Sequence, residues 1–341
     1  MRYLKIYALC LGVFLLILAS DNSDINAQED LVKFQFDLNR PVVRHGGNNE
    51  WDARHTAPGA VVFHNGQFHM FRNGYRGWPQ PSQVGYLTSE DGVRWTEVME
   101  QPVFSHGSVP FNTARLALLT SAIVEDDGTW VFYFAPFNSQ GNPTLGVLRA
   151  TAATPTSPWV MDDHVLLEPG RDGEWDENFM AITNVIKNDE GYFLYYAAGN
   201  NAGDMAIGLA TSDDGIQWSK NNNPSTSGTF SESDPVLRKT ENWEVNIQDP
   251  RVVNTPDGWV MLYSSFDGNF RNQGYNIAIS DDGIHWEKIQ STPVLARSDI
   301  NRNPWYPELA YRNGIYYFYL EADTFDGGTD IFVSTFSGSF R

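Results

Sequence analysis

The hydrophobic positions of this chain fall into five similar stretches, each with two short apolar runs on either side of a glycine turn. The runs are rich in Val, Ile, Phe, Tyr and Trp, which is typical of β-strands. Beyond the N-terminal stretch, no window has apolar positions that follow a helical period. The pattern therefore predicts five strand–turn–strand units, and their turn glycines are Gly66, Gly128, Gly191, Gly258 and Gly314.

A seven-residue phrase, Ser-x-Asp-Gly-x-x-Trp, follows a further apolar run in three of the units, at residues 89–95, 212–218 and 280–286. Asp-Gly favours a tight hairpin, because glycine adopts positive φ without a Cβ clash and aspartate tolerates it. We therefore predict a third strand before the phrase and a fourth strand opening with its Trp. The second unit has a longer loop instead, at residues 151–159, and keeps the Trp.

Five units of four antiparallel strands predict an all-β fold, a five-bladed β-propeller. The expected blades cover approximately residues 55–104, 115–168, 178–238, 246–296 and 305–341. The last unit ends soon after its third strand, so we expect residues 32–44 to supply its outer strand. Closure of this kind joins the two ends of the chain and leaves no open repeat edge.

The N-terminal stretch reads as a signal peptide, residues 1–27, with the propeller domain at 28–341. Arg2 and Lys5 precede an apolar run at residues 6–19, which is short for a membrane span and suits a secretory signal. An uncleaved anchor is the alternative. A secreted or periplasmic protein without stable membrane insertion is expected. Its only cysteine, Cys10, would be removed with the signal, which excludes disulfides and thiol chemistry.

The net charge of −19 argues against nucleic acid or an anionic membrane as a partner, because both would require the opposite sign. A neutral oligosaccharide or polysaccharide fits this charge. The 11 Trp, 15 Tyr and 21 Phe residues suit either sugar stacking or packing between blades. No cofactor is expected and no metal-spacing motif is present, although a structural ion in the central channel stays open.

These phrases, with the Trp-Asp pairs at residues 51–52 and 175–176, resemble the five-bladed propellers shared by arabinanases, xylosidases, invertases, levansucrases and mannosyl-oligosaccharide phosphorylases. The sialidase Asp-box is different, since it has an extra residue between Asp and Gly. The resemblance covers the whole chain after the signal. It implies a glycoside-processing site at the end of the central channel where the innermost strands begin.

Cleavage of a glycoside needs an acid that protonates the leaving oxygen and a second carboxylate that activates water or attacks carbon. Asp249 in a Gln-Asp-Pro-Arg phrase and Glu308 in a Trp-Tyr-Pro-Glu phrase are similar to catalytic phrases of this group. Glu177 and Asp52 are the further catalytic candidates. Asp52 has a counterpart in Asp176, and a repeated position favours a structural role.

The chain departs from the hydrolase branches of the group at two places. The position of their base aspartate, in the first blade, holds Ala57, and the position of their acid glutamate, in the third blade, is apolar at Met180. Either the carboxylates have moved around the ring, or the protein is not a hydrolase of the usual kind.

Seven residues are candidates for substrate binding, and each has a structural alternative. The histidine could orient a sugar hydroxyl, the arginines could bind hydroxyls or phosphate or pair with carboxylates, and the tryptophans could stack on sugar rings. They are His55, Arg54, Arg72, Arg115, Arg251, Trp78 and Trp305.

Three functions remain open from the sequence. The first is a secreted glycoside hydrolase that acts on a neutral glycan with inversion. The second is a glycoside phosphorylase or transferase of the same fold, suggested by the Asp-Pro-Arg phrase and the additional arginines. The third is a glycan-binding propeller without activity, suggested by Ala57.

Overall fold

The computed structural model describes residues 31–341 except 112–115, 145, 268 and 270. The expected signal peptide lies outside these residues. The described residues form antiparallel β-sheets, and their helical segments are the short 3-10 turns η1 (His106–Ser108), η2 (Gly228–Phe230) and η3 (Arg297–Asp299). The prediction of an all-β protein is confirmed. No helix within the described part is long and apolar enough to cross a membrane.

Within each unit consecutive strands pair with one another, except for two short outer strands that pair with the third strand of their unit. The first unit holds β1 (His55–His64), β2 (Gln67–Tyr75), β3 (Gln83–Ser89), β4 (Thr96–Glu97) and β5 (Phe104–Ser105). The second holds β6 (Leu116–Val124), β7 (Trp130–Phe137), β8 (Leu148–Ala152) and β9 (Val160–Met161). The third holds β10 (Phe179–Asn188), β11 (Gly191–Gly199), β12 (Met205–Ser212) and β13 (Ser219–Lys220).

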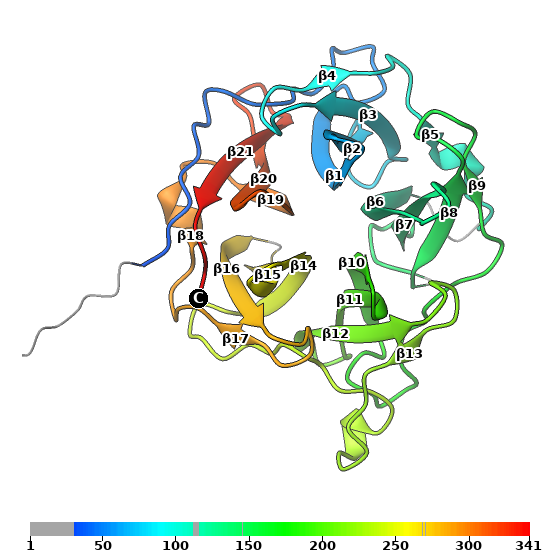
Figure 1. Ribbon diagram of the computed structural model, residues 1–341, viewed down its shortest axis with the longest axis vertical. Coiled ribbons are helices and arrows are strands. Elements are labelled where there is room, and N and C mark those ends of the chain that lie inside the picture. Colours follow the sequence, from blue (N-terminus) through cyan, green and yellow to red (C-terminus); the bar gives the residue numbers. More distant parts are fainter. Residues whose placement is uncertain (1–30, 112–115, 145, 268, 270) are drawn as a thin grey trace, which may run out of the picture. The chain divides into compact units, whose positions relative to one another are not determined.

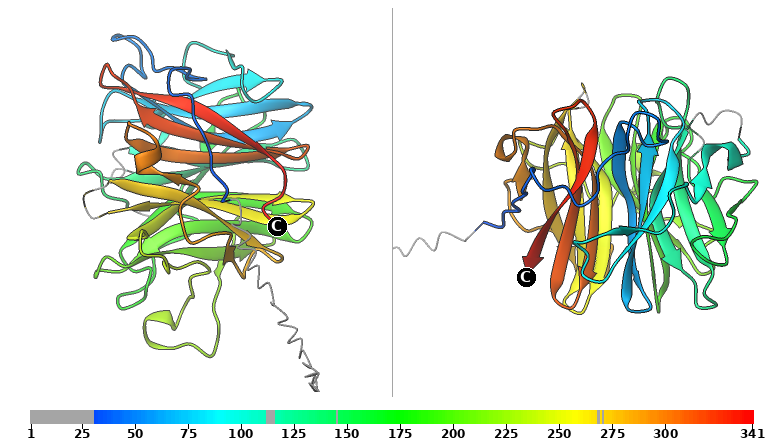
Figure 2. Two further views of the ribbon diagram at one scale, coloured as in Figure 1. Left: turned by 90° about the vertical axis from the view of Figure 1, so that its left-hand side faces the viewer. Right: turned by 90° about the horizontal axis from the view of Figure 1, so that it is seen from above.

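The fourth unit holds β14 (Asn246–Thr255), β15 (Gly258–Phe266), β16 (Asn272–Ser280), β17 (Glu287–Lys288) and β18 (Leu295–Ala296). The last holds β19 (Pro304–Arg312), β20 (Ile315–Asp323) and β21 (Thr329–Ser337). The first strands of the units, β1, β6, β10, β14 and β19, lie around a central space in Figure 1. Figure 2 shows the sheets from the side, packed next to one another. This arrangement brings together the first strands of the units, which are far apart in the sequence.

The first and last units are joined by backbone contacts. Val43, far upstream of β1, forms an antiparallel bridge with Ile331 in β21, and the two residues exchange backbone hydrogen bonds. β21 also meets β1 through a parallel pairing of Thr329 with His55. The two ends of the domain therefore stabilise each other, as closure requires.

The repeated Ser-x-Asp-Gly-x-x-Trp phrase forms the predicted hairpin in all three places. The glycines have φ values of 73°, 70° and 74° at Gly92, Gly215 and Gly283. At the first copy, Ser89 Oγ accepts the Gly92 amide at 2.9 Å, and Asp91 Oδ1 accepts the amides of residues 93 and 94. These backbone amides hold the pKa of the Asp91 carboxyl well below its usual range. The acidic phrase is therefore a turn at the edge of the sheet.

Aromatic side chains fill the space between neighbouring sheets. Trp159 stacks on Phe132 with ring centroids 3.4 Å apart, and Trp259 of β15 packs against Phe193 of β11. The phrase tryptophans also contact tyrosines, as Trp286 does with Tyr195. At this copy of the phrase the tryptophan packs between two sheets, whereas Trp218 contacts Tyr192 of its own sheet.

Candidate functional site

Each of the innermost strands changes its pairing register near its start. The shifts lie between Pro58 and Ala60, Leu119 and Ser121, Ala181 and Thr183, Gln248 and Arg251, and Pro304 and Pro307. A β-bulge leaves a residue unpaired and redirects its side chain, and bulges are frequent beside active sites. The bulges sit at the end of the channel where the resemblance placed a site.

Asp249 occupies the bulge of β14. Its φ is 56°, in the left-handed region that aspartate tolerates better than most residues. The side chain is buried, and Ser264 Oγ donates a hydrogen bond to Oδ2 at 2.5 Å. Its other oxygen, Oδ1, has no hydrogen-bond partner. Burial raises the pKa of Asp249 to about 6, against the lowering effects of Ser264 and Arg251. The carboxyl is thus ionised at neutral pH and keeps one oxygen free.

Glu321, near the end of β20, is a second buried carboxyl and was not predicted. Thr329 Oγ1 donates to its Oε1 at 2.6 Å, and the Tyr75 hydroxyl donates to the same atom at 3.4 Å. Oε2 has no hydrogen-bond partner. Burial raises the pKa of Glu321 to about 8, which keeps the carboxyl protonated at neutral pH. It can therefore donate a proton.

Two buried tyrosines, Tyr306 and Tyr275, lie near both Asp249 and Glu321. The pKa values of Tyr306 and Tyr275 are both raised, first by burial and then by the charges of Asp249 and Glu321. The two tyrosines therefore lie within electrostatic range of both carboxyl groups. The Tyr275 hydroxyl is held by the Trp305 carbonyl at 2.5 Å. Asp249, Glu321 and the tyrosines form the carboxyl cluster.

An apolar surface occupies the side of β6 and β10. It consists of buried and partly buried side chains that contact Tyr75 and Tyr306, namely Leu116, Leu118, Ala135, Phe137, Ala181, Ile182 and Phe179. Of these two strands, β10 holds Met180, the position where the hydrolase branches of the resembling group have an acid. In this protein the carboxyls come from β14 and β20 and face apolar strands.

Glu308 and Arg251 form a separate buried pair. Arg251 Nε lies 3.3 Å from Glu308 Oε2, and burial raises the pKa of Glu308 to about 7 against the lowering charge of Arg251. The guanidinium also donates to the carbonyls of Pro307, Thr120 and Thr183. Arg251 was predicted to bind substrate, and its donors are instead shared among backbone carbonyls of three other strands or turns.

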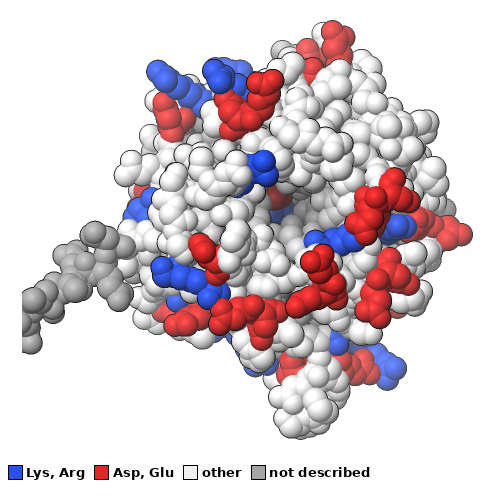
Figure 3. Space-filling view, viewed as in Figure 1, with Lys and Arg blue, Asp and Glu red and all other residues white. Residues whose placement is uncertain are grey.

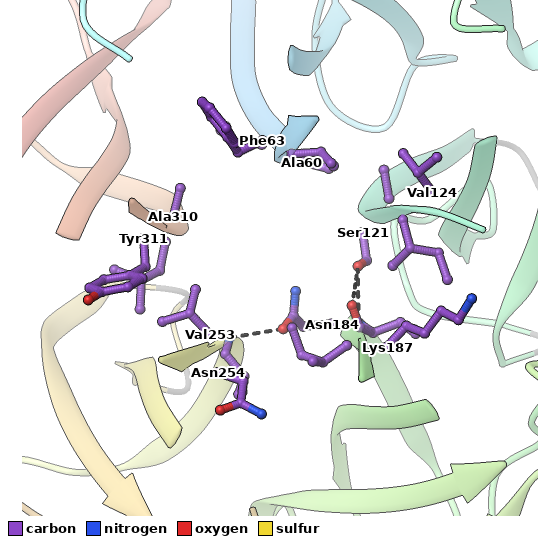
Figure 4. Close-up of a pocket in the computed structure, with 18 of the residues that line it drawn as sticks. Ala60, Phe63, Ser121, Val124, Asn184, Lys187, Val253, Asn254, Ala310 and Tyr311 are labelled. Atoms are coloured by element: carbon purple, nitrogen blue, oxygen red, sulfur yellow. Dashed lines mark hydrogen bonds between the residues drawn. The ribbon is translucent and has the colours of Figure 1, made fainter. Parts of the chain in front are cut away.

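Glu308 lines a cavity of about 800 Å³ that the five innermost strands enclose. Asp249 and Glu321 are not among its lining residues. In Figure 4 the amide nitrogen of Asn184 points into this space, while its oxygen accepts the Val252 amide at 2.9 Å. Figure 3 shows a hollow near the centre of the face, with charged side chains at its rim. The cavity and the carboxyl cluster are therefore two different parts of the channel.

Several other predicted residues lie close to the carboxyl cluster. His55 stacks on Tyr75 with centroids 4.8 Å apart, and its Nδ1 lies 3.3 Å from Thr329 Oγ1. Burial and Arg54 lower the pKa of His55, so the ring is neutral at pH 7. Trp78 is 43% exposed and packs near Tyr75. The Trp305 indole donates to Asp323 at 2.7 Å.

The remaining candidates have other partners. Glu177 is partly buried and accepts the amides of Gly173 and Asn201, which lower its pKa. Arg54 is exposed, and Arg115 lies outside the described residues. Asp52 binds Arg72 at 2.5 Å. None of these contacts involves Asp249 or Glu308, so the structure does not bring the four predicted carboxylates together.

Asp52 and Asp176 follow equivalent tryptophans, and each binds a cation of its own unit, Arg72 of β2 and Lys220 of β13. Asp52 Oδ2 lies 2.5 Å from Arg72 Nη1, and Asp176 Oδ2 lies 2.6 Å from Lys220 Nζ. All four side chains are largely buried. The repetition indicates that this pair holds the loop before each inner strand.

We expect Asp176→Asn to lower the free energy of unfolding by about 3 kcal/mol, because it leaves Lys220 without its carboxylate partner, and Asp52→Asn to lower it by less, because Arg72 keeps its ion pair with Glu97. Denaturant unfolding measures this loss. Turnover per folded molecule is expected to stay within about twofold of the wild type for both. A loss of turnover in Asp52→Asn alone would assign that carboxyl to catalysis.

The sequence contained one signal for Glu321. The strand Ile-Tyr-Tyr-Phe-Tyr-Leu-Glu-Ala-Asp is apolar until this carboxylate, and its neighbours Tyr319 and Leu320 are fully buried. A charged residue in a buried run usually has a partner or a function. Glu321 lies near the end of a second strand, outside the segments before the innermost strands where catalytic residues were expected.

The described residues contain no group of three or more His, Cys, Asp or Glu side chains that could hold a metal ion. The carboxyl cluster is thus an arrangement of protonatable oxygens and phenols on a β-propeller. These are the groups that acid–base cleavage of an acetal uses.

Comparison with known proteins agrees with the fold. No protein-family model matches the chain. A 1,2-β-oligomannan phosphorylase of Thermoanaerobacter sp. strain X514 is 23% identical over 316 residues, covering 87% of this chain and 96% of the relative. The fold is that of the glycoside hydrolase-like propellers, and the resemblance stated from the sequence is confirmed at this level.

Two solved structures illustrate the likeness. One belongs to the GH130 family of mannoside phosphorylases, which contains hydrolases that target β-1,2-mannosidic linkages in Candida mannan. It has a TM-score of 0.65 and 15% identity, covering 90% of this chain and 94% of that one. The other is a family 117 glycoside hydrolase of Zobellia galactanivorans, with a TM-score of 0.63 and 17% identity over 89% and 90% of the chains.

Proposed function

We propose that this protein is a glycoside hydrolase in which Glu321 is the general acid and Asp249 the general base. The observation that carries the proposal is the difference between the two buried carboxyls. Burial raises the pKa of Glu321 to about 8 and that of Asp249 to about 6, so one is protonated and the other ionised at pH 7. Two carboxyls with separated pKa values are the arrangement that acid–base pairs use.

In the proposed reaction, Glu321 gives its proton to the glycosidic oxygen as the bond to the anomeric carbon breaks. Asp249 takes a proton from a water molecule that attacks this carbon from the opposite face, which inverts the configuration. Ser264 orients Asp249, and Thr329 and Tyr75 orient Glu321, through the hydrogen bonds that they donate. Proton NMR of the first product formed tests inversion, because retention would make Asp249 a nucleophile.

A neutral β-mannoside is the proposed substrate. The Thermoanaerobacter relative acts on 1,2-β-oligomannan by its name. A net charge of −19 disfavours an acidic glycan. β-1,2-Mannobiose is therefore the first substrate to assay, followed by other neutral disaccharides.

Phosphorolysis is the second candidate, because the same relative is a phosphorylase. Phosphate needs free cationic donors near the anomeric carbon. Arg251 and Arg72 use most of their guanidinium donors on carbonyls and on Asp52, Glu308 and Glu97, although Arg72 Nε has no hydrogen-bond partner and Arg54 is exposed. We therefore favour hydrolysis. The assay compares disaccharide cleavage in phosphate-free buffer and in phosphate, and formation of mannose 1-phosphate would overturn hydrolysis.

We also propose that the units form five blades closed by the N-terminal segment. The contact between Val43 and Ile331 supports closure. Secretion after cleavage of a signal peptide at residues 1–27 remains part of the proposal. N-terminal sequencing of the protein from its native host tests it.

The two carboxyls predict a bell-shaped pH dependence. As pH rises through about 6, Asp249 loses its proton and kcat/KM rises, and as pH passes about 8, Glu321 loses the proton that it must donate, so kcat/KM falls. Initial rates between pH 4.5 and 9.5 measure the two limbs. A profile that keeps rising above pH 9 would exclude Glu321 as the acid.

A further inference from the structure

The turn between β20 and β21 begins and ends beside the proposed acid. Glu321 is two residues from the end of β20, and Thr329, the first residue of β21, donates the 2.6 Å hydrogen bond to it. The intervening residues 324–328 therefore lie at the mouth of the site. We call them the rim turn.

The rim turn exposes a phenyl ring. Phe325 is 88% exposed, the largest exposed fraction among the large hydrophobic side chains of the described residues. The Arg302 guanidinium lies 4.4 Å from its ring centroid. A cation on a phenyl face holds the ring by attraction to its π-electrons. The ring is thus supported by the guanidinium and otherwise faces solvent.

The backbone below this ring is fixed by hydrogen bonds. Thr324 N donates to Gly328 O at 2.8 Å, and Asp323 N donates to Asn303 O at 3.1 Å. Gly328 also packs so closely that a Cβ there would lie 2.4 Å from the Arg54 carbonyl oxygen. The rim turn therefore presents Phe325 in a defined place.

We propose that Phe325, supported by Arg302, is a subsite for a sugar ring remote from the bond that is cleaved. This inference rests on the proposed function, and it makes the substrate an oligosaccharide rather than a disaccharide. The apolar C–H face of a sugar stacks on an aromatic face. Phe325 lies four residues from Glu321, at most roughly 13 Å along the backbone, which is on the scale of a few sugar rings.

The negative charges around the rim turn favour a neutral sugar at this subsite. Asp326 is exposed within the turn and pairs with His45 at 3.2 Å, and Asp323 precedes it. Arg302 Nη1 donates a hydrogen bond of 3.4 Å to the Asp323 carbonyl. A uronate would meet two carboxylates here, so the subsite favours a ring without charge.

The test measures kcat/KM on β-1,2-mannobiose, -mannotriose and -mannotetraose for the wild type, Phe325→Ala and Arg302→Met. We expect the ratio of tetraose to biose to fall about three- to tenfold in Phe325→Ala and to a smaller extent in Arg302→Met. Val160→Ala, which changes another exposed hydrophobic side chain on β9, is the matched control and keeps the wild-type ratio.

The outcomes separate this inference from the proposed function. Wild-type protein that cleaves none of these mannosides or other neutral glycosides overturns the proposed function. Active wild type with an unchanged ratio in Phe325→Ala overturns the subsite alone. Faster cleavage of a uronate-containing tetrasaccharide than of the neutral one, lost in Phe325→Ala, overturns its neutral specificity.

Discussion

We expect Glu321→Gln to lower kcat on a disaccharide by about 10²–10⁴-fold, because glutamine cannot give a proton to the leaving oxygen. The loss is expected to be much smaller on a dinitrophenyl glycoside, whose leaving group departs without protonation. The alkaline limb of the pH profile disappears in the same variant. Steady-state rates on the two substrates measure the effect, and an equal loss on both would exclude Glu321 as the acid.

Stability serves as the control for Glu321→Gln. Burial raises the pKa of Glu321 to about 8 from 4.5, so between these pH values the folded protein holds a proton that the unfolded chain releases. The protonated Glu321 therefore makes its full contribution to the free energy of unfolding below pH 4.5. This contribution is lost as the pH rises through 8. Glutamine cannot ionise, so the variant is expected to be more stable than the wild type at pH 9. Glu308→Gln, another buried glutamine substitution, is the matched variant, with an expected loss in kcat of about tenfold or less.

We expect Asp249→Asn to lower kcat/KM by about 10²–10⁴-fold, because the amide cannot take a proton from water. Asparagine tolerates the left-handed backbone at φ 56°, so the fold is expected to persist. The acidic limb of the pH profile disappears, and rates from pH 4.5 to 9.5 measure this.

Ser264→Ala provides a graded comparison for Asp249. Its hydroxyl lowers the pKa of Asp249 by donating to the carboxylate. Alanine removes that bond, so the pKa rises and the acidic limb moves to higher pH while activity at pH 8 is largely kept. A limb that stays in place would show that it belongs to another group.

The repeats made the fold predictable from the sequence. The spacing of the glycine turns and the Asp-Gly phrase are local, since the hydrogen bonds of Ser89 and Asp91 stay within a few residues. The strands they delimit could therefore be predicted without knowledge of distant contacts. The apolar runs then allowed only an all-β arrangement.

The site was harder to predict because it depends on contacts between distant residues. Asp249 was identified by its phrase, which also explains its bulge. Glu321 obtains its environment from Tyr75, which is 246 positions earlier in the chain, and no local pattern contains that contact. Glu177 has the right chemistry for an acid, but amides of Gly173 and Asn201 hold it at the surface.

Arg251 has a consequence for how the protein folds. Its guanidinium binds carbonyls of β6 and β10 and of Pro307 in β19, contacts that span 131, 68 and 56 positions of sequence. Repeats in open arrays contact only their neighbours and can unfold one by one. Here one side chain needs four units in place at once, so the units gain their stability jointly. The rigidity that an acid–base pair requires is therefore expected only when at least these four units are folded together.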